Sequence, residues 1–258
     1  MYSEWKRTFC KVKDSFQTQK IWFIFIFVWV CVCTLGMVEN VSSKYMILGV
    51  NTSAIDYIIY QQEANFSGIQ IFPFIFLSGM KCKCNSIEIQ HILRYKTKAK
   101  LFRSQLRESL VYSTVAGGVL VGLSAVIGYI QSGVLLNWSD MGSVYFYKTG
   151  GETLQGNFYV LVGVAWLFYI LKFMILFQIM DILLWFSKWL FLFWVMYLVV
   201  LVVEIGYVGK ILFKVFSIDY ILCKTPIAFV LLILLGSAVL CIEHILGIQL
   251  IRQRDVGR

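Results

Sequence analysis

The sequence is poor in charged residues, and it has only two prolines and two histidines. Charged side chains make up 14% of the 258 residues, whereas hydrophobic side chains make up 59%. Soluble domains usually have about 25% charged residues, which help to cover their surface with polar groups. This shortage excludes an ordinary water-soluble domain, and we expect the lipid bilayer to solvate most of the chain.

Motifs for nucleotide binding and for common catalytic chemistry are also missing. The chain has no G-x-x-x-x-G-K-[ST] phosphate-binding loop and no H-E-x-x-H zinc motif. Its cysteines are scattered, and the Cys82-x-Cys84 pair with nearby His91 offers too few ligands for a metal site. We therefore expect no catalytic residue, metal or cofactor in this chain, and we do not expect it to be an enzyme.

Long apolar runs predict an all-α membrane protein, a single transmembrane domain over residues 1–258. At about 20 residues per membrane crossing, we expect about six transmembrane helices, near 21–38, 68–84, 110–130, 158–186, 189–207 and 227–251. The second is short for a span, and Pro73 interrupts it. Residues 1–20 are basic and amphipathic and predict an interfacial helix, and Ile55–Tyr60 predicts a short helix lying against the membrane.

Lysine and arginine are distributed unequally among the predicted loops. They concentrate in residues 1–20, in the loop 81–108 and after Ile251, whereas the loops 39–67 and 131–156 carry one lysine each. The positive-inside rule therefore predicts that the basic loop and both termini lie in the cytoplasm. The predicted outer loop, residues 208–225, departs mildly from the rule with three lysines. The net charge of +9 thus reflects membrane orientation, and we expect no nucleic-acid partner.

Small and ionisable residues mark possible contacts between the predicted helices. Gly122 follows Gly118 by four residues, which favours close helix packing on that face. Ionisable residues inside spans are costly and often functional, and the candidates are Lys172, Glu204, Glu243 and His244. At about 1.5 Å per residue, Lys172 and Glu243 have similar depths, so we hypothesise an ion pair that is either functional or structural. We expect Glu204 to face a cavity or the outer interface.

Three stretches resemble the permease subunits of bacterial ABC transporters, in particular the type-2 exporter-like permeases of Firmicutes. Ala54–Ser78 resembles the outer segment and second helix of that family, and Ile92–Leu106 (ILRYKTKAKLFRSQL) is similar to its motif between the second and third helices. Leu246–Val256 (LGIQLIRQRDV) resembles the basic ending after the last helix. The expected six helices and the amphipathic start agree with this family over the whole chain.

The resemblance implies a transporter subunit that uses an external source of energy. Two permease subunits, identical or related, would dock on two copies of an ABC ATPase that bind ATP and magnesium. A coupling helix at about Ser86–Leu106 would enter a groove of the ATPase. The ATPase-coupling residues would be Ile89, Ile92, Leu93, Arg94, Tyr95, Lys96 and Lys98. Alternatively, the basic residues among these serve only as topology anchors.

The implied function is ATP-driven export or clearance of peptides, drugs or other amphipathic molecules at the bacterial plasma membrane. Relatives of this kind include bacteriocin immunity proteins. The main alternative is a non-transporting sensor or accessory subunit that binds a transporter or an antimicrobial peptide. A membrane-embedded enzyme and a channel are further alternatives, which the scarcity of polar clusters and stripes disfavours.

Overall fold

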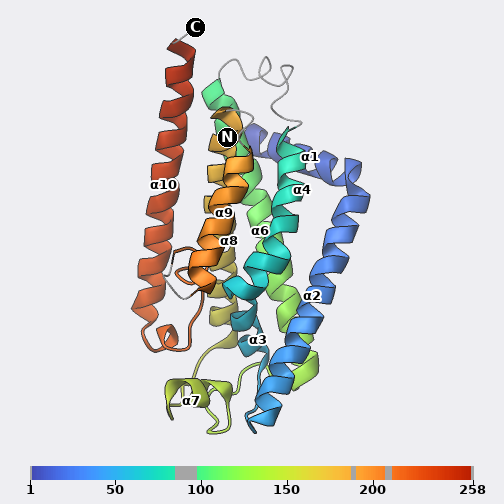
Figure 1. Cartoon of the computed structure of the whole chain (residues 1–258), viewed down its shortest axis with the longest axis vertical. Coiled ribbons are helices and arrows are strands. Elements are labelled where there is room, and N and C mark those ends of the chain that lie inside the picture. Colours follow the sequence, from blue (N-terminus) through green and yellow to red (C-terminus); the bar gives the residue numbers. More distant parts are fainter. Residues whose placement is uncertain (1, 85–97, 187–189, 207–210, 257–258) are drawn as a thin grey trace.

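The computed structural model describes residues 2–84, 98–186, 190–206 and 211–256. They form an elongated helical bundle, so the expected all-α fold is confirmed for this part of the chain (Figure 1). The elements are α1 (Tyr2–Thr18), α2 (Lys20–Ile47), α3 (Ala54–Gln61), the π-helix η1 (Ala64–Ile71), α4 (Phe72–Cys84), α6 (Lys98–Ser132), α7 (Val144–Thr149), α8 (Phe158–Phe186), α9 (Leu190–Ile205), the 3-10 helix η3 (Leu222–Lys224) and α10 (Pro226–Val256).

Four of these helices, α2, α6, α8 and α10, are long and apolar enough to cross a membrane. They coincide with the predicted first, third, fourth and sixth spans. The second and fifth predicted spans coincide with shorter apolar helices, Ala64–Met80 and Phe191–Ile205. The largest difference in bounds is in α6, which begins at Lys98 instead of residue 110.

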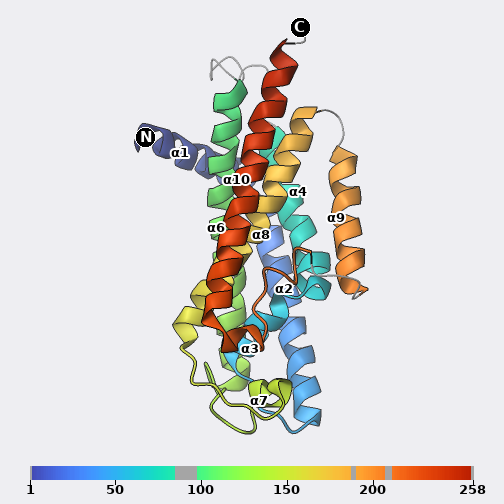
Figure 2. The ribbon, with the colours of Figure 1, turned by 90° about the vertical axis from the view of Figure 1, so that its left-hand side faces the viewer.

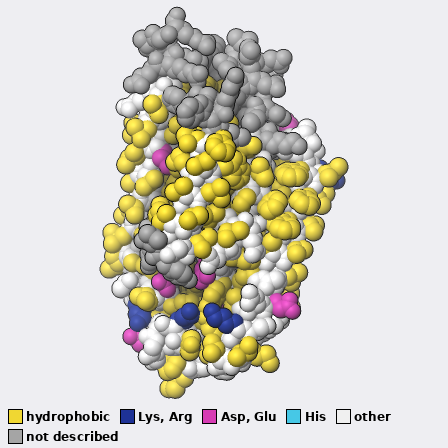
Figure 3. Space-filling model, in the orientation of Figure 1, with side chains coloured by type: hydrophobic (Ala, Val, Ile, Leu, Met, Phe, Trp, Pro, Cys, Tyr) yellow, Lys and Arg dark blue, Asp and Glu magenta, His cyan; other side chains and the backbone are white. Residues whose placement is uncertain are grey.

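Different helices occupy the two ends of the bundle. One end holds α1, the start of α6 and the last turns of α10, and we name it the α1 end; the α7 end lies opposite (Figures 1 and 2). On the face seen in Figure 3, hydrophobic side chains cover the middle of the bundle, and lysine and arginine side chains gather near the α7 end. α10 exposes apolar side chains along most of its length, including Ile227, Val230, Leu234, Ile242 and Ile245, as expected for a helix that faces lipid.

Helix α1 lies across the end of the bundle, at a steep angle to α2 (Figures 1 and 2). Its Lys11 forms an ion pair of 3.0 Å with Glu108 of α6. Thr8 and Val12 are buried against the bundle, whereas Phe9, which the sequence pattern places on the apolar face, is 58% exposed. An exposed aromatic ring on a helix in this position suits the membrane interface.

Helix α3 packs inside the bundle, so the expectation that it lies against the membrane is wrong. Its Ile55, Tyr57 and Ile58 are fully buried. The close approach of α3 to α6 requires Gly128, since a Cβ atom there would lie 2.7 Å from Cδ2 of Tyr57. Of the predicted Gly118–Gly122 face, an added Cβ at Gly118 would lie 3.5 Å from Nε1 of Trp166 in α8, whereas one at Gly122 would have no atom within 4 Å, so only Gly118 lies at a helix contact.

Candidate functional site

The segment between α2 and α6 is interrupted in its middle. α3 ends at Gln61, and the next residues, Gln62 and Glu63, separate it from η1. We call these two residues the helix break. In η1, the N–H of Phe72 donates to the carbonyl of Ser67, five residues earlier. π-helical stretches are rare in proteins, and many of them occur at functional sites.

Pro73 explains a second contact near the break. A proline has no backbone N–H, so Pro73 cannot continue the π-helical pattern by donating to the carbonyl of Gly68. The hydroxyl of Tyr197 in α9 donates to this carbonyl instead. A Cβ atom at Gly68 would meet Cδ2 of Leu201, so η1 and α9 pack closely at this glycine.

Lys172 of α8 stabilises the helix break from the opposite side. Its Nζ atom donates to the backbone oxygen of Gln62 at 3.2 Å, and the residue is fully buried. The ammonium also lies 5.4 Å from the ring centre of Tyr169 and 5.7 Å from that of Phe213. A cation is favourable at the carbonyl end of a helix and over aromatic faces, so Lys172 compensates the carbonyl end of α3.

The hypothesised ion pair between Lys172 and Glu243 does not form. Among the described residues, Oε2 of Glu243 is buried without a hydrogen-bond partner, and the same is true of Nδ1 of His244. The His244 ring stacks on Phe102, with ring centres 5.7 Å apart. Counting residues along two helices gives their relative depth, but it does not give the direction in which each side chain leaves its helix.

Glu204, at the end of α9, organises the backbone that follows it. Its carboxylate oxygens accept hydrogen bonds from the N–H groups of residues 211, 212, 213 and 214, at 2.8, 2.6, 2.9 and 3.2 Å. Glu204 is fully buried. Because buried N–H groups need an acceptor, this single side chain holds a non-helical stretch of backbone inside the protein.

The stretch that begins there, residues 211–225, was predicted to be an outer loop, but it folds into the bundle. We call it the inserted segment. Phe213, Phe216 and Ile218 are buried, and the N–H of Ile218 donates to Oε1 of Gln62 at 2.8 Å. The side chain of Gln62 thus joins the inserted segment to the helix break.

Asp56 fixes the far end of the inserted segment. Its carboxylate accepts hydrogen bonds from Tyr220 Oη at 3.0 Å, from Trp138 Nε1 at 3.0 Å, and from Ser53 N at 2.8 Å and Oγ at 2.6 Å. The donors come from three separate parts of the chain. Beside them, burial and the nearby carboxylates raise the pKa of Cys223 to about 12, which lowers the thiolate fraction of this side chain near neutral pH.

A cavity of about 380 Å³ lies next to the helix break. Apolar residues of α3, α9 and the inserted segment line it together with polar and charged ones, namely Glu63, Asn65, Lys148, Glu204, Lys214 and Asp219. Lys148 belongs to α7, so the cavity reaches the α7 end. Within the described ranges, no cluster of three His, Cys, Asp or Glu residues could hold a metal ion, and the arrangement suits binding of a polar or charged group.

The expected ATPase-coupling residues lie mostly outside the described residues: Ile89, Ile92, Leu93, Arg94, Tyr95 and Lys96. Lys98 begins α6. The expected coupling helix from Ser86 to Leu106 is therefore corrected in its second half, where residues 98–106 are the first turns of α6. Leu101 and Phe102 pack against Trp185 and Ile251, so their apolar character serves the packing of this chain.

Sequence reasoning missed Gln62, Asp56 and Tyr220, which hold the interrupted segments together. A local signal exists for the first of these, because the polar run Gln61-Gln62-Glu63 separates two apolar stretches ahead of Pro73. Two of the partners of Asp56, Trp138 and Tyr220, lie 82 and 164 positions further along the chain, and no local pattern indicates them. This chain matches no protein-family model, no curated protein and no solved structure.

Proposed function

We propose that this chain is the membrane-spanning permease subunit of an ATP-driven transporter in a bacterial plasma membrane. A separate ABC ATPase, in two copies, would bind and hydrolyse ATP, and a second permease subunit, identical or related, would complete the pathway. The cargo would be a peptide, a drug or another amphipathic molecule. The choice of this family rests on the resemblance of three sequence stretches, and the transport role rests on the interrupted helix.

The interrupted helix is the observation that carries the proposal. Irregular backbone within a membrane protein is tolerated where it is buried in protein or lines a cavity. In many transporters, substrate and ion sites lie at such discontinuous helices. Here a buried lysine stabilises the helix break, and a partly polar cavity of about 380 Å³ lies beside it. A protein that served only as a membrane anchor would not need either feature.

Six membrane crossings follow if the two shorter apolar helices also cross the membrane. η1 and α4 together comprise residues 64–84, which at about 1.5 Å per residue span about 30 Å, the thickness of the hydrocarbon core. α9 has 16 residues, and the inserted segment would complete its crossing. The α1 end would then face the cytoplasm, because most lysine and arginine residues of the sequence belong to segments at or next to that end.

The first experiment is affinity purification of the full-length chain from its own bacterial membranes in mild detergent, followed by mass spectrometry. We expect a P-loop ATPase to co-purify at about one copy per chain. Deletion of residues 88–100 should abolish this association while the chain stays in the membrane, whereas Lys148→Gln, at the α7 end, should leave it intact. Purification without any P-loop ATPase would refute the proposal.

The second experiment separates transport from binding alone. The purified complex is reconstituted into liposomes, and ATP-dependent movement of a fluorescent amphipathic peptide is measured. A Walker-lysine variant of the ATPase subunit serves as the control for the requirement for ATP. Association with the ATPase but no ATP-dependent movement of such probes would favour the non-transporting accessory subunit instead.

A further inference from the structure

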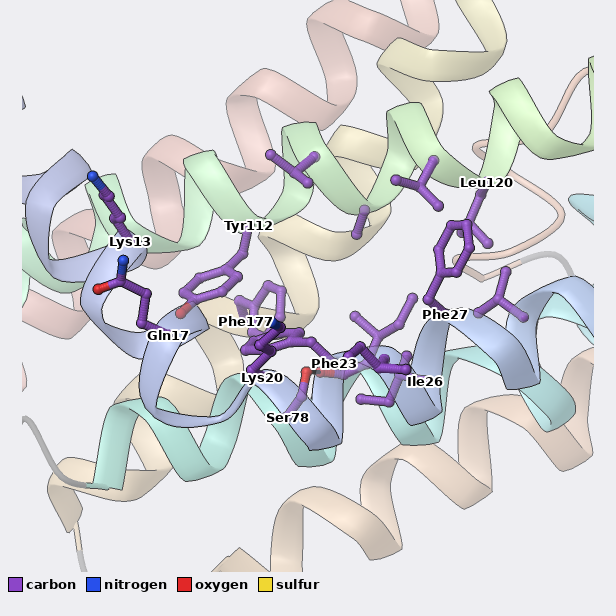
Figure 4. A pocket seen from close by; sticks show the side chains of 16 residues that line it. Lys13, Gln17, Lys20, Phe23, Ile26, Phe27, Ser78, Tyr112, Leu120 and Phe177 are labelled. Atoms are coloured by element: carbon purple, nitrogen blue, oxygen red, sulfur yellow. Dashed lines mark hydrogen bonds between the residues drawn. The ribbon is translucent and has the colours of Figure 1, made fainter.

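A larger cavity, of about 620 Å³, opens on the side of the bundle between α2 and α6. We call it the lateral groove. Side chains of α2 and α6 form its walls, and Ser78 of α4 and Phe177 of α8 lie between them (Figure 4). Ile75 of α4 also lines the cavity. Its volume lies in the range of small-molecule sites, about 300–1,000 Å³. It is separate from the cavity of about 380 Å³ beside the helix break, and the two cavities share no lining residue.

The chemistry of the lateral groove changes along its length. Besides the hydroxyls of Ser78 and Tyr112, its polar side chains are Lys13 and Gln17 of α1 and Lys20 at the start of α2, and these three lie toward one end (Figure 4). All three are exposed. Gln17 follows Lys13 by four residues, so the two share one face of α1, and Lys20 begins α2 directly after the turn between the two helices. The remaining lining is almost entirely apolar, with Phe27 and Leu120 at the other end (Figure 4).

The length of the lateral groove matches one leaflet of a membrane. From Lys20 to Val30, the lining residues of α2 cover ten steps of the helix, or about 15 Å at 1.5 Å per residue. Half of a hydrocarbon core of about 30 Å is also about 15 Å. α1, which crosses the bundle end at this level, has the position of an interfacial helix beside lipid headgroups.

We propose that the lateral groove binds an anionic phospholipid from the leaflet next to α1. Its phosphate would lie between Lys13 and Lys20, Gln17 would donate to a headgroup oxygen, and one acyl chain would extend along Phe23, Ile26 and Val30. A compact cation binds phosphate oxygens well, and an apolar groove of this length suits a single acyl chain. The proposal does not depend on the transport function.

Charge and shape favour a lipid over a second copy of the chain. Two copies that met at this face would bring two pairs of lysines, Lys13 and Lys20 of each copy, toward each other, and like charges disfavour such an interface. An α-helix of a partner, with a diameter of about 10–12 Å including side chains, is also much wider than an acyl chain.

Native mass spectrometry of the full-length, delipidated protein tests the proposal. The protein is titrated with dioleoyl phosphatidylglycerol or with dioleoyl phosphatidylcholine, and bound lipids are counted. We expect about 30-fold tighter binding of the anionic lipid. The double variant Lys13→Gln/Lys20→Gln should weaken its binding about 30-fold, toward the value of the zwitterionic lipid, because two phosphate-binding lysines are lost.

Two further variants serve as controls. Lys6→Gln/Lys44→Gln removes the same charge from exposed positions that line neither cavity, and it should leave the affinity unchanged within about twofold. Val115→Trp, at a lining residue that is 46% exposed, should weaken binding of both lipids by filling the lateral groove.

Three results would overturn the proposal. The first is equal affinity for the two lipids, and the second is an equal loss of affinity in both double-lysine variants. The third is a dimer that Val115→Trp dissociates while lipid binding stays unchanged, which would assign the lateral groove to a second copy.

Discussion

The ammonium nitrogen of Lys172 lies 3.2 Å from the backbone oxygen of Gln62, so a side chain of α8 closes the carbonyl end of α3. Through this contact, the lysine side chain supplies a hydrogen bond that the backbone of α3 does not supply itself. A carbonyl that the broken helix leaves without its usual partner gains a charged donor. Lys172 therefore has a structural role that is independent of transport, and its removal should lower the free energy of unfolding.

Replacing Lys172 with methionine tests this structural role. Methionine keeps roughly the length of the side chain but has no ammonium group, so the buried carbonyl of Gln62 loses this hydrogen-bond donor. We expect a loss of about 1–3 kcal/mol in the free energy of unfolding. Thermal unfolding in detergent measures the change. Glu243→Gln is the comparison, and it should have little effect because Oε2 of Glu243 has no hydrogen-bond partner among the described residues. Equal losses in the two variants would restore the ion-pair hypothesis.

Glu204→Gln should release the inserted segment. The carboxylate accepts four backbone N–H groups, whereas the glutamine side chain presents one oxygen and an NH₂ group that cannot accept. We expect a loss of roughly 2–4 kcal/mol, with faster hydrogen exchange at the amides of residues 211–214. Glu39→Gln changes an exposed glutamate of α2 and should leave the exchange as it is. Unchanged exchange in Glu204→Gln would contradict the assigned role.

The reactivity of Cys223 should report whether the inserted segment is closed. Burial raises the pKa of this thiol to about 12, so in a single-cysteine variant it should react with a maleimide at least about tenfold more slowly than the exposed Cys10. Its rate should still rise steeply between pH 7 and pH 10, because the thiolate fraction keeps growing below the pKa, whereas an ordinary thiol levels off above about pH 8.5.

The same measurement links Cys223 to Glu204. In the Glu204→Gln variant, the loosened segment should expose the thiol and bring its rate close to that of Cys10. A Cys223 that reacts rapidly in the unaltered protein would show that the segment is open in detergent.

Alanine at two glycines of α6 tests the contact with α3. Gly128→Ala brings a Cβ atom to 2.7 Å from the Tyr57 ring and 3.3 Å from the Ala54 backbone, and we expect a loss of about 1–3 kcal/mol from this overpacking. Gly122→Ala meets nothing within 4 Å and should be neutral or stabilising by up to about 1 kcal/mol, because alanine favours helices. The reverse order of unfolding temperatures would support the Gly118–Gly122 face that the sequence predicts.

The long helices could be predicted from the sequence because a membrane-crossing helix has to be continuously apolar over a known length. α8 begins and ends at the predicted residues, Phe158 and Phe186. The start of α6 could not be predicted in this way. Its first turns are rich in polar residues, and Leu101 and Phe102 find their partners, Trp185 and Ile251, far along the chain.

The candidate site could be predicted only in part. Apolar surroundings identify Lys172 and Glu204 as unusual residues, and both belong to the buried polar contacts of the structure. Their partners are backbone groups at the helix break and in the inserted segment. Backbone groups have no sequence signature of their own, so the sequence suggested a charged side chain, Glu243, as the partner of Lys172.

The attachment of the inserted segment has a mechanical consequence. Near its start the segment is fastened to α9 through Glu204, and further on Tyr220 fastens it to α3 through Asp56. A sliding motion of α9 along the long axis would therefore pull on α3, unless one of these attachments breaks first. The inserted segment thereby couples α9 to α3 mechanically, so a displacement of either helix would be transmitted to the other.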